Sequence, residues 1–204
     1  MNGRRVGRLA CALCLCLSVA PAWLSAWAGE LTALELFARL PITLFENTPE
    51  GLSEDEKLRL IERGASEAWE VEHFDDDSFV MVSRPFGETR VSMRVFRGGP
   101  ALLAALGTDD GAMCALELWQ EDATGGFVPA NPPEEPQIAD FLSRGRRLGR
   151  DVSPAYVFCL NGDGLDVRPL FWGPEGLVEV PVNRSVRYVW KAGRFEKTVS
   201  DRPE

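Results

Sequence analysis

The sequence is 204 residues long and carries 31 acidic against 22 basic side chains, a formal net charge of −9. An acidic surface repels the phosphate backbones of nucleic acids, so we exclude nucleic acid as a partner. Hydrophobic residues make up 45% of the chain, which argues against a disordered protein and predicts a folded core.

The first 28 residues have the three parts of a secretory signal peptide. Three arginines form a positive start, an apolar run follows over 9–20, and Pro21 ends that run. The small-x-small pattern at 26–28 predicts cleavage after Ala28. The apolar run is too short to span a bilayer, so we expect a periplasmic or secreted protein with no membrane span after cleavage.

Cleavage after Ala28 leaves 176 residues with 19 basic and 31 acidic side chains, a net charge of −12. This length suits one domain with a hydrophobic core. We therefore expect residues 29–204 to form a single domain.

Two amphipathic helices are expected at the start of this domain. Apolar side chains recur at helical spacing over 31–40, and Pro41 ends the first helix. Ser53 and Glu56 form a capping box, in which each side chain binds a free backbone amide at the helix start. The second helix begins there and ends at Gly64.

From Ala68 onwards the hydrophobic period changes to two, which indicates β-strands. Short turns, among them 75–78 and 85–88, predict antiparallel hairpins rather than parallel crossovers. The expected strands in this part of the chain are 69–73, 79–82, 90–95, 102–106, 114–119 and 127–128.

A proline-rich connection at 129–136 interrupts the strands, because proline removes amide donors that a central strand needs. We expect a rigid connection within one domain, followed by one inserted helix over 137–147. The expected strands after this helix are 155–160, 165–172, 177–180, 186–190 and 195–199.

These elements predict an α+β fold with a mostly antiparallel sheet of about eight to ten strands, two N-terminal helices and one inserted helix. A partly closed barrel is the alternative, since a sheet of so many strands tends to curl. Trp119, Trp172 and Trp190 each end a strand, where we expect them to fill the hairpin core; a ligand groove is the alternative.

Cys114 and Cys159 are the two cysteines that remain after cleavage. An even number in an oxidising compartment predicts a disulfide, whereas two separately buried thiols are the alternative. A disulfide that closes the loop between Cys114 and Cys159 would stabilise the fold by about 4 kcal/mol in the loop-entropy account.

His73 is the only histidine, and it precedes three aspartates at 75–77. In a hydrolase it would be the general base with an aspartate orienting its ring; otherwise it is a core or edge histidine. A single histidine excludes zinc sites built on two or more. The acidic segment 161–166 matches a tight turn better than a calcium loop, so we expect no metal and no cofactor.

Four arginines form the only basic cluster: Arg144, Arg146, Arg147 and Arg150. They form a candidate ligand-binding surface for an anionic group of the cell envelope. Alternatively, they complement the dipole at the end of the inserted helix and pair with surface acids.

The sequence contains no Gly-x-Ser-x-Gly elbow and no dinucleotide fingerprint. We therefore expect an exported binding or interaction protein for an envelope ligand or protein, acting through the arginine cluster or a sheet edge. A periplasmic hydrolase that uses His73 with nearby acidic residues is one alternative. A structural or assembly component of the envelope, with an exposed apolar patch, is the other.

Overall fold

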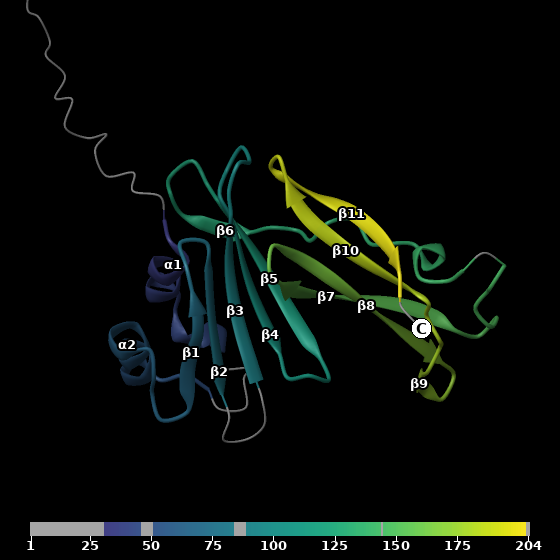
Figure 1. Ribbon diagram of the computed structural model, residues 1–204, viewed down its shortest axis with the longest axis horizontal. Helices are drawn as coiled ribbons and strands as arrows, with labels where there is room; N and C mark the ends of the chain where they lie inside the picture. Colours follow the sequence, from purple (N-terminus) through teal and green to yellow (C-terminus); the bar gives the residue numbers. More distant parts are fainter. Residues whose placement is uncertain (1–30, 46–50, 84–88, 144, 203–204) are drawn as a thin grey trace, which may run out of the picture. The chain divides into compact units, whose positions relative to one another are not determined.

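Figure 1 shows the computed structural model of the chain. It describes residues 31–45, 51–83, 89–143 and 145–202, all of which belong to the unit Leu31–Glu204. Three predicted features lie outside the described residues: the signal peptide 1–28, the turn 85–88 and Arg144.

The first sheet contains six antiparallel strands in chain order. They are β1 Trp69–Phe74, β2 Ser78–Ser83, β3 Thr89–Phe96, β4 Leu103–Asp109, β5 Cys114–Glu121 and β6 Phe127–Pro129. Each strand pairs with its neighbour in the sequence, so the sheet is a meander, as the predicted hairpins require.

The second sheet has the strand order β11–β10–β8–β7, and β9 pairs with the C-terminal part of β8. Its strands are β7 Ser153–Asn161, β8 Gly164–Gly173, β9 Gly176–Val178, β10 Arg184–Lys191 and β11 Arg194–Asp201. The mostly antiparallel, β-rich prediction is confirmed in outline. The partly closed barrel is wrong, because the eleven strands of the described residues form two separate sheets.

The proline-rich connection separates the two sheets. Pro129 ends β6, and residues 130–137 contain no strand, since their prolines cannot donate to a ladder. Tyr188 of β10 donates a 2.6 Å hydrogen bond to the carbonyl of Glu134, and Pro136 is buried. The connection is therefore held against the second sheet and does not extend the first.

Two α-helices precede the first sheet, as predicted: α1 Ala33–Arg39 and α2 Glu54–Arg63, with the 3-10 helix η1 Ile42–Phe45 between them. Both α-helices begin with a capping box. α1 packs on β2 and β3, and α2 packs on β1. The ring of Phe37 stacks on Phe79 with 4.5 Å between centroids, so the helices and the sheet share a hydrophobic core.

The predicted inserted helix over 137–147 is wrong. Only a 3-10 turn, η2 Ile138–Asp140, forms there. The carbonyl of Phe141 accepts hydrogen bonds from the amides of Asn183 and Arg184, each 3.3 Å long, and the side chain of Asn183 accepts one from Ser143. These bonds occupy backbone groups that a continuing helix would need.

The two sheets meet where β7 packs against β4 and β5. Cys114 at the start of β5 forms a disulfide with Cys159 of β7, which confirms the predicted pair; their Cα atoms are 5.5 Å apart. Phe96 of β3 contacts Trp190 and Phe195 of the second sheet, with ring centroids 5.3 and 5.1 Å away. The contact between the sheets is therefore both covalent and aromatic.

Candidate functional site

A cavity of about 650 Å³ lies along the outer edge of β1, and we refer to it as the β1 cleft. Its volume falls within the range of about 300–1,000 Å³ that is typical of small-ligand sites. Its apolar lining residues are Leu34, Leu60, Ile61, Val71, Phe74 and Phe79. Its other lining residues are Glu62, Arg63, Gly64, Ala65, Glu70, Glu72 and His73.

The apolar floor of the β1 cleft is the margin of the main core. Leu60 and Phe79 are almost fully buried members of that core, and Leu34 packs against it. Phe74, at the end of β1, is 65% exposed. The helices therefore leave apolar surface uncovered beside the last residues of β1.

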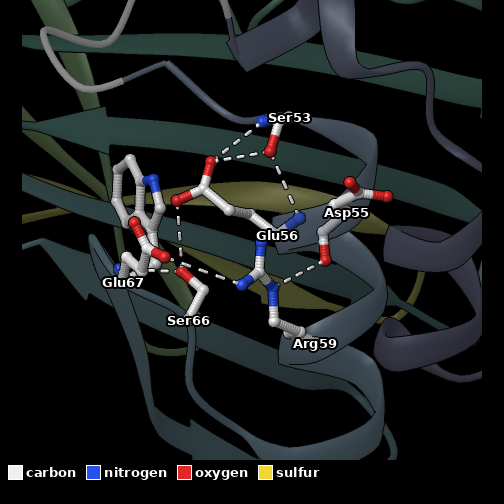
Figure 2. Close-up of polar contacts among 7 residues, drawn as sticks. Ser53, Asp55, Glu56, Arg59, Ser66 and Glu67 are labelled. Carbon is white, nitrogen blue, oxygen red and sulfur yellow. Dashed lines mark hydrogen bonds and ion pairs between the residues drawn. The ribbon is translucent and has the colours of Figure 1, made fainter.

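The connection between α2 and β1 forms one wall of the cleft, through Gly64 and Ala65. Figure 2 shows the polar contacts that hold this connection. The Ser66 hydroxyl lies 3.4 Å from Glu56 Oε1 and accepts a 3.1 Å hydrogen bond from the amide of Trp69. Because these bonds tie the connection to both α2 and β1, the wall is fixed before any ligand binds.

The outer edge of β1 has backbone groups that point away from β2. In an antiparallel pair, successive residues alternately bond the partner strand and face outward. Val71 faces outward, since its amide donates to the carbonyl of Gly64 at 2.8 Å. Asp75 bonds inward to Ser78, also at 2.8 Å, so the amide and carbonyl of Phe74 face the free edge. The register irregularity between Val71 and His73 shifts the alternation by one residue, so Val71 and Phe74 both face outward although they are three residues apart.

The rim of the β1 cleft carries charges of both signs. Three carboxylates line it, those of Glu62, Glu70 and Glu72, against the single guanidinium of Arg63. Glu72 also pairs with Arg90 of β3 at 2.7 Å, which places Glu72 on the face of the sheet where Arg90 lies. Arg90 therefore offsets part of the negative charge of the rim.

His73 lies in the β1 cleft with its ring exposed, and its Nε2 is 3.1 Å from Asp75 Oδ2. Burial alone would raise the pKa of Asp75. The hydrogen bond with His73 and those from the amides of Asp77 and Ser78 outweigh it and hold the pKa below its usual value. The structure thus brings the predicted histidine and an aspartate together, as an exposed local pair at the end of a strand.

No hydroxyl or thiol side chain is among the described residues that line the β1 cleft. A histidine base of the hydrolase type needs a nucleophile within hydrogen-bond reach, or groups that position a water and stabilise the developing charge. The catalytic role of His73 therefore stays a prediction.

The arginine cluster lies elsewhere. Arg146, Arg147 and Arg150 are exposed in the loop before β7, and none of them lines the β1 cleft. Among residues with described positions, no side chain forms an ion pair with these three. The helix-dipole explanation of the cluster is wrong, since the described residues directly before it form only the 3-10 turn η2. Its ligand-binding role stays a prediction.

A smaller polar cavity of about 260 Å³ lies beside the disulfide, where the two sheets meet. Its charged groups largely neutralise one another: Arg168 pairs with Asp109 at 2.6 Å, and Arg187 pairs with Asp166 at 3.0 Å. Across the ranges that the structure describes, no group of histidine, cysteine and acidic side chains has the arrangement of a metal site. In those same ranges, no helix is long and apolar enough to cross a bilayer.

Sequence reasoning named a sheet edge as a working surface but did not identify which one. The apolar lining at Leu34, Leu60 and Ile61 belongs to the two predicted helices. Phe74 does not follow the alternation over 69–73, in which the even positions are polar, so the sequence pattern does not show that β1 extends to Phe74. Comparison with protein-family models, with curated proteins and with solved structures gives no match to this chain.

Proposed function

We propose that this chain is an exported, non-enzymatic binding module and that its ligand occupies the β1 cleft. One observation carries the proposal: a cavity of ligand size combines an apolar floor with outward-facing backbone groups and a charged rim. Binding sites commonly have this composition, a mostly apolar lining with a few convergent polar groups.

The binding role is favoured over the hydrolase because of what surrounds His73. Asp75, its partner, also accepts the amide of Asp77 at 2.9 Å, as expected of a residue that stabilises the β1–β2 turn. The pair is therefore explained by local structure. A hydrolase that uses His73 stays the alternative prediction.

The proposed location outside the cytoplasm is supported by two features. The disulfide between Cys114 and Cys159 is typical of proteins that fold in oxidising compartments. The first 28 residues have the composition of a cleavable export signal.

An assembly or structural role is the remaining alternative. Trp172 and Leu177 are cross-strand partners on β8 and β9 and are 50% and 63% exposed. Two side chains form a small apolar surface compared with the patches of several hundred Å² that mark interaction sites. This alternative also stays a prediction.

Occupancy of the β1 cleft can be tested with a neutral apolar fluorophore, N-phenyl-1-naphthylamine. We expect its fluorescence to rise on binding the purified protein. Ala65 is exposed and lines the cleft, so Ala65→Trp fills the cleft at little cost to folding. A poor fit costs about 1–3 kcal/mol, so this variant should bind the probe about tenfold more weakly.

The matched control is Ala123→Trp, which places the same side chain in the exposed turn between β5 and β6, away from the β1 cleft. It should bind the fluorophore as the unmodified protein does. Equal binding by all three proteins, with unchanged unfolding midpoints, would show that the cleft is not the binding site.

A further inference from the structure

We infer that the protein forms a symmetric dimer, in which the outer edge of β11 pairs with the same edge of a second copy. The inference goes beyond the proposed function, because β11 belongs to the second sheet whereas the β1 cleft lies on the first. We refer to residues 196–202 along this edge as the β11 seam. The outward-facing backbone of the seam and the match between its side chains and those of a second copy carry the inference.

The backbone of the β11 seam has unused hydrogen-bonding groups. β11 is the last strand of its sheet and pairs only with β10, along its whole length and without a register shift (Figure 1). The amide of Arg202 donates to the carbonyl of Asn183 at 2.9 Å, so every second residue counted back from Arg202 bonds β10. The residues between them, Lys197, Val199 and Asp201, direct their amides and carbonyls away from β10. No described residue forms a hydrogen bond with these outward groups.

The other sheet edges are less suited to pairing. Residues 64–65 already bond part of the β1 edge, β6 has only three residues, and β7 contains Pro154 and packs against the first sheet. The first residues of β11 are also in use, since Phe195 contacts Phe96 and lines a cavity together with the proline-rich connection. The β11 seam begins after them. A long open edge invites unspecific pairing, and a specific partner strand removes that risk.

The charged side chains of the β11 seam have partners inside their own chain, with one exception. The ammonium of Lys197 donates a 2.7 Å hydrogen bond to Asp140 of η2, so it is not the free edge charge that keeps other strands away. Glu196 and Asp201 pair with arginines of β11 and β10 at 3.1 and 3.3 Å. Within the described ranges, Arg202 forms no ion pair. The match between two copies therefore depends on which charges face each other, and it needs no net charge.

One register of a symmetric antiparallel pair matches the two seams. It places Val199 on the two-fold axis, directly opposite Val199 of the second copy. Between one copy and the other, it also forms the cross-strand pairs Lys197–Asp201, Glu196–Arg202 and Thr198–Ser200. Each contact joins two apolar side chains, two opposite charges or two hydroxyl groups, and such pairs stabilise neighbouring strands. The outward backbone groups of the seam meet one another in the same register.

The neighbouring registers match less well. With Thr198 on the axis, Arg194 lies opposite Arg202 of the second copy, and with Lys197 on the axis two lysines face each other. Like charges directly opposite are destabilising. With Ser200 on the axis, the ladder shortens to residues 198–202. The side chains therefore favour the register centred on Val199.

Dimer formation can be measured by sedimentation of the purified protein. A seam this short belongs to the small, weak interfaces, so the concentrations run from about 1 μM to about 1 mM. We expect the protein to pass from monomer to dimer over this range. Hydrogen exchange at the outward amides of Lys197, Val199 and Asp201 should slow as the dimer forms, whereas the amide of Ser200, which bonds β10, should change little.

The register is tested with a charge swap. Glu196→Arg and Arg202→Glu each place like charges opposite each other at two symmetry-related positions, so each variant should dimerise about tenfold more weakly. The double variant, Glu196→Arg with Arg202→Glu, restores opposite charges and should dimerise as the unmodified protein does. The matched control is Glu117→Arg, which changes an exposed glutamate on β5 and should leave the dimerisation unchanged.

A protein that stays monomeric at about 1 mM would overturn the inference. So would a dimer in which the three outward amides exchange as fast as in the monomer. If the double variant melts like the unmodified protein but does not regain its dimerisation, the register centred on Val199 is wrong. The β1 cleft lies on the other sheet, so none of these results bears on the proposed function.

Discussion

Gly107 of β4 lies where β7 crosses the first sheet. A Cβ atom at this position would lie 2.6 Å from the Cβ of Leu160, closer than two carbon atoms can approach. Glycine therefore permits the close packing of β7 on β4, which also brings Cys159 within reach of Cys114.

Gly107→Ala should lower the free energy of unfolding by about 1–3 kcal/mol, because the added methyl group overpacks the contact between the sheets. Urea unfolding measures this change. Gly149→Ala is the control, since its Cβ would meet only Val152, at an ordinary 3.5 Å. In a Leu160→Gly background the same substitution should cost less. A full cost in that background would mean that Leu160 is not the clashing group.

Among single residues, the sequence predicted the disulfide pair correctly, but its prediction that Trp119, Trp172 and Trp190 all fill hairpin cores is wrong for Trp172. Trp190 donates a 2.6 Å hydrogen bond to the carbonyl of Arg97 and contacts Phe96, as a core residue does. Trp172 is half exposed, although it also ends a strand. Position in a hairpin does not show which face meets a second sheet, and that is why the two differ.

At the scale of elements, capping boxes define the starts of both α-helices, and each contains a carboxylate with a lowered pKa. The amide of Thr32 lowers the pKa of Glu35, and the hydroxyl of Thr32 adds to this effect. For Glu56, burial raises the pKa, but hydrogen bonds from Ser53 and Ser66 outweigh it. These bonds therefore stabilise the folded protein only while the carboxylates are ionised.

The resulting prediction concerns acid stability. Each carboxylate stabilises the fold fully above its unfolded-state pKa, about 4.3 for glutamate, and this contribution is lost as the pH falls through the lower folded-state value. The free energy of unfolding should therefore decrease below about pH 4.3. Urea unfolding across this range should show a shallower decrease for Glu56→Gln. A slope identical to that of the unmodified protein would contradict the role of Glu56.

Local signals explain which elements could be predicted. The capping box needs only the four residues from Ser53 to Glu56, so the start of α2 can be predicted locally. The alternation over 69–73 likewise predicts β1 from the strand's own residues. The helix expected over 137–147 failed because Asn183, forty residues after Ser143, binds its backbone. The β1 cleft could not be located from the sequence either, because it depends on which strand ends the sheet and on how far α2 covers it.

At the scale of the whole described unit, a covalent bond, an aromatic cluster and the ion pair between Arg168 of β8 and Asp109 of β4 connect the two sheets. The disulfide joins β5 to β7, and Phe96 contacts Trp190 and Phe195. Neither sheet pairs with the other by backbone hydrogen bonds among the described strands. The bridge therefore fixes the position of β7 on the first sheet.

Reduction of the Cys114–Cys159 bridge should lower the free energy of unfolding by up to about 4 kcal/mol, the loop-entropy value for a separation of 45 residues. Thermal unfolding with and without reductant measures the effect. The double variant Cys114→Ser with Cys159→Ser should unfold at the lower temperature in both conditions. An unchanged melting temperature after complete reduction would show that side-chain packing alone holds the sheets together.

The meander of the first sheet also has a consequence for the order of folding. Every ladder in it joins strands that are adjacent along the chain, so each closes only a short loop at small entropic cost. A polypeptide that emerges amino terminus first would have its first six strands assembled while the second sheet was still being delivered. Cys114 would then already have its place in the first sheet before Cys159 becomes available to form the disulfide.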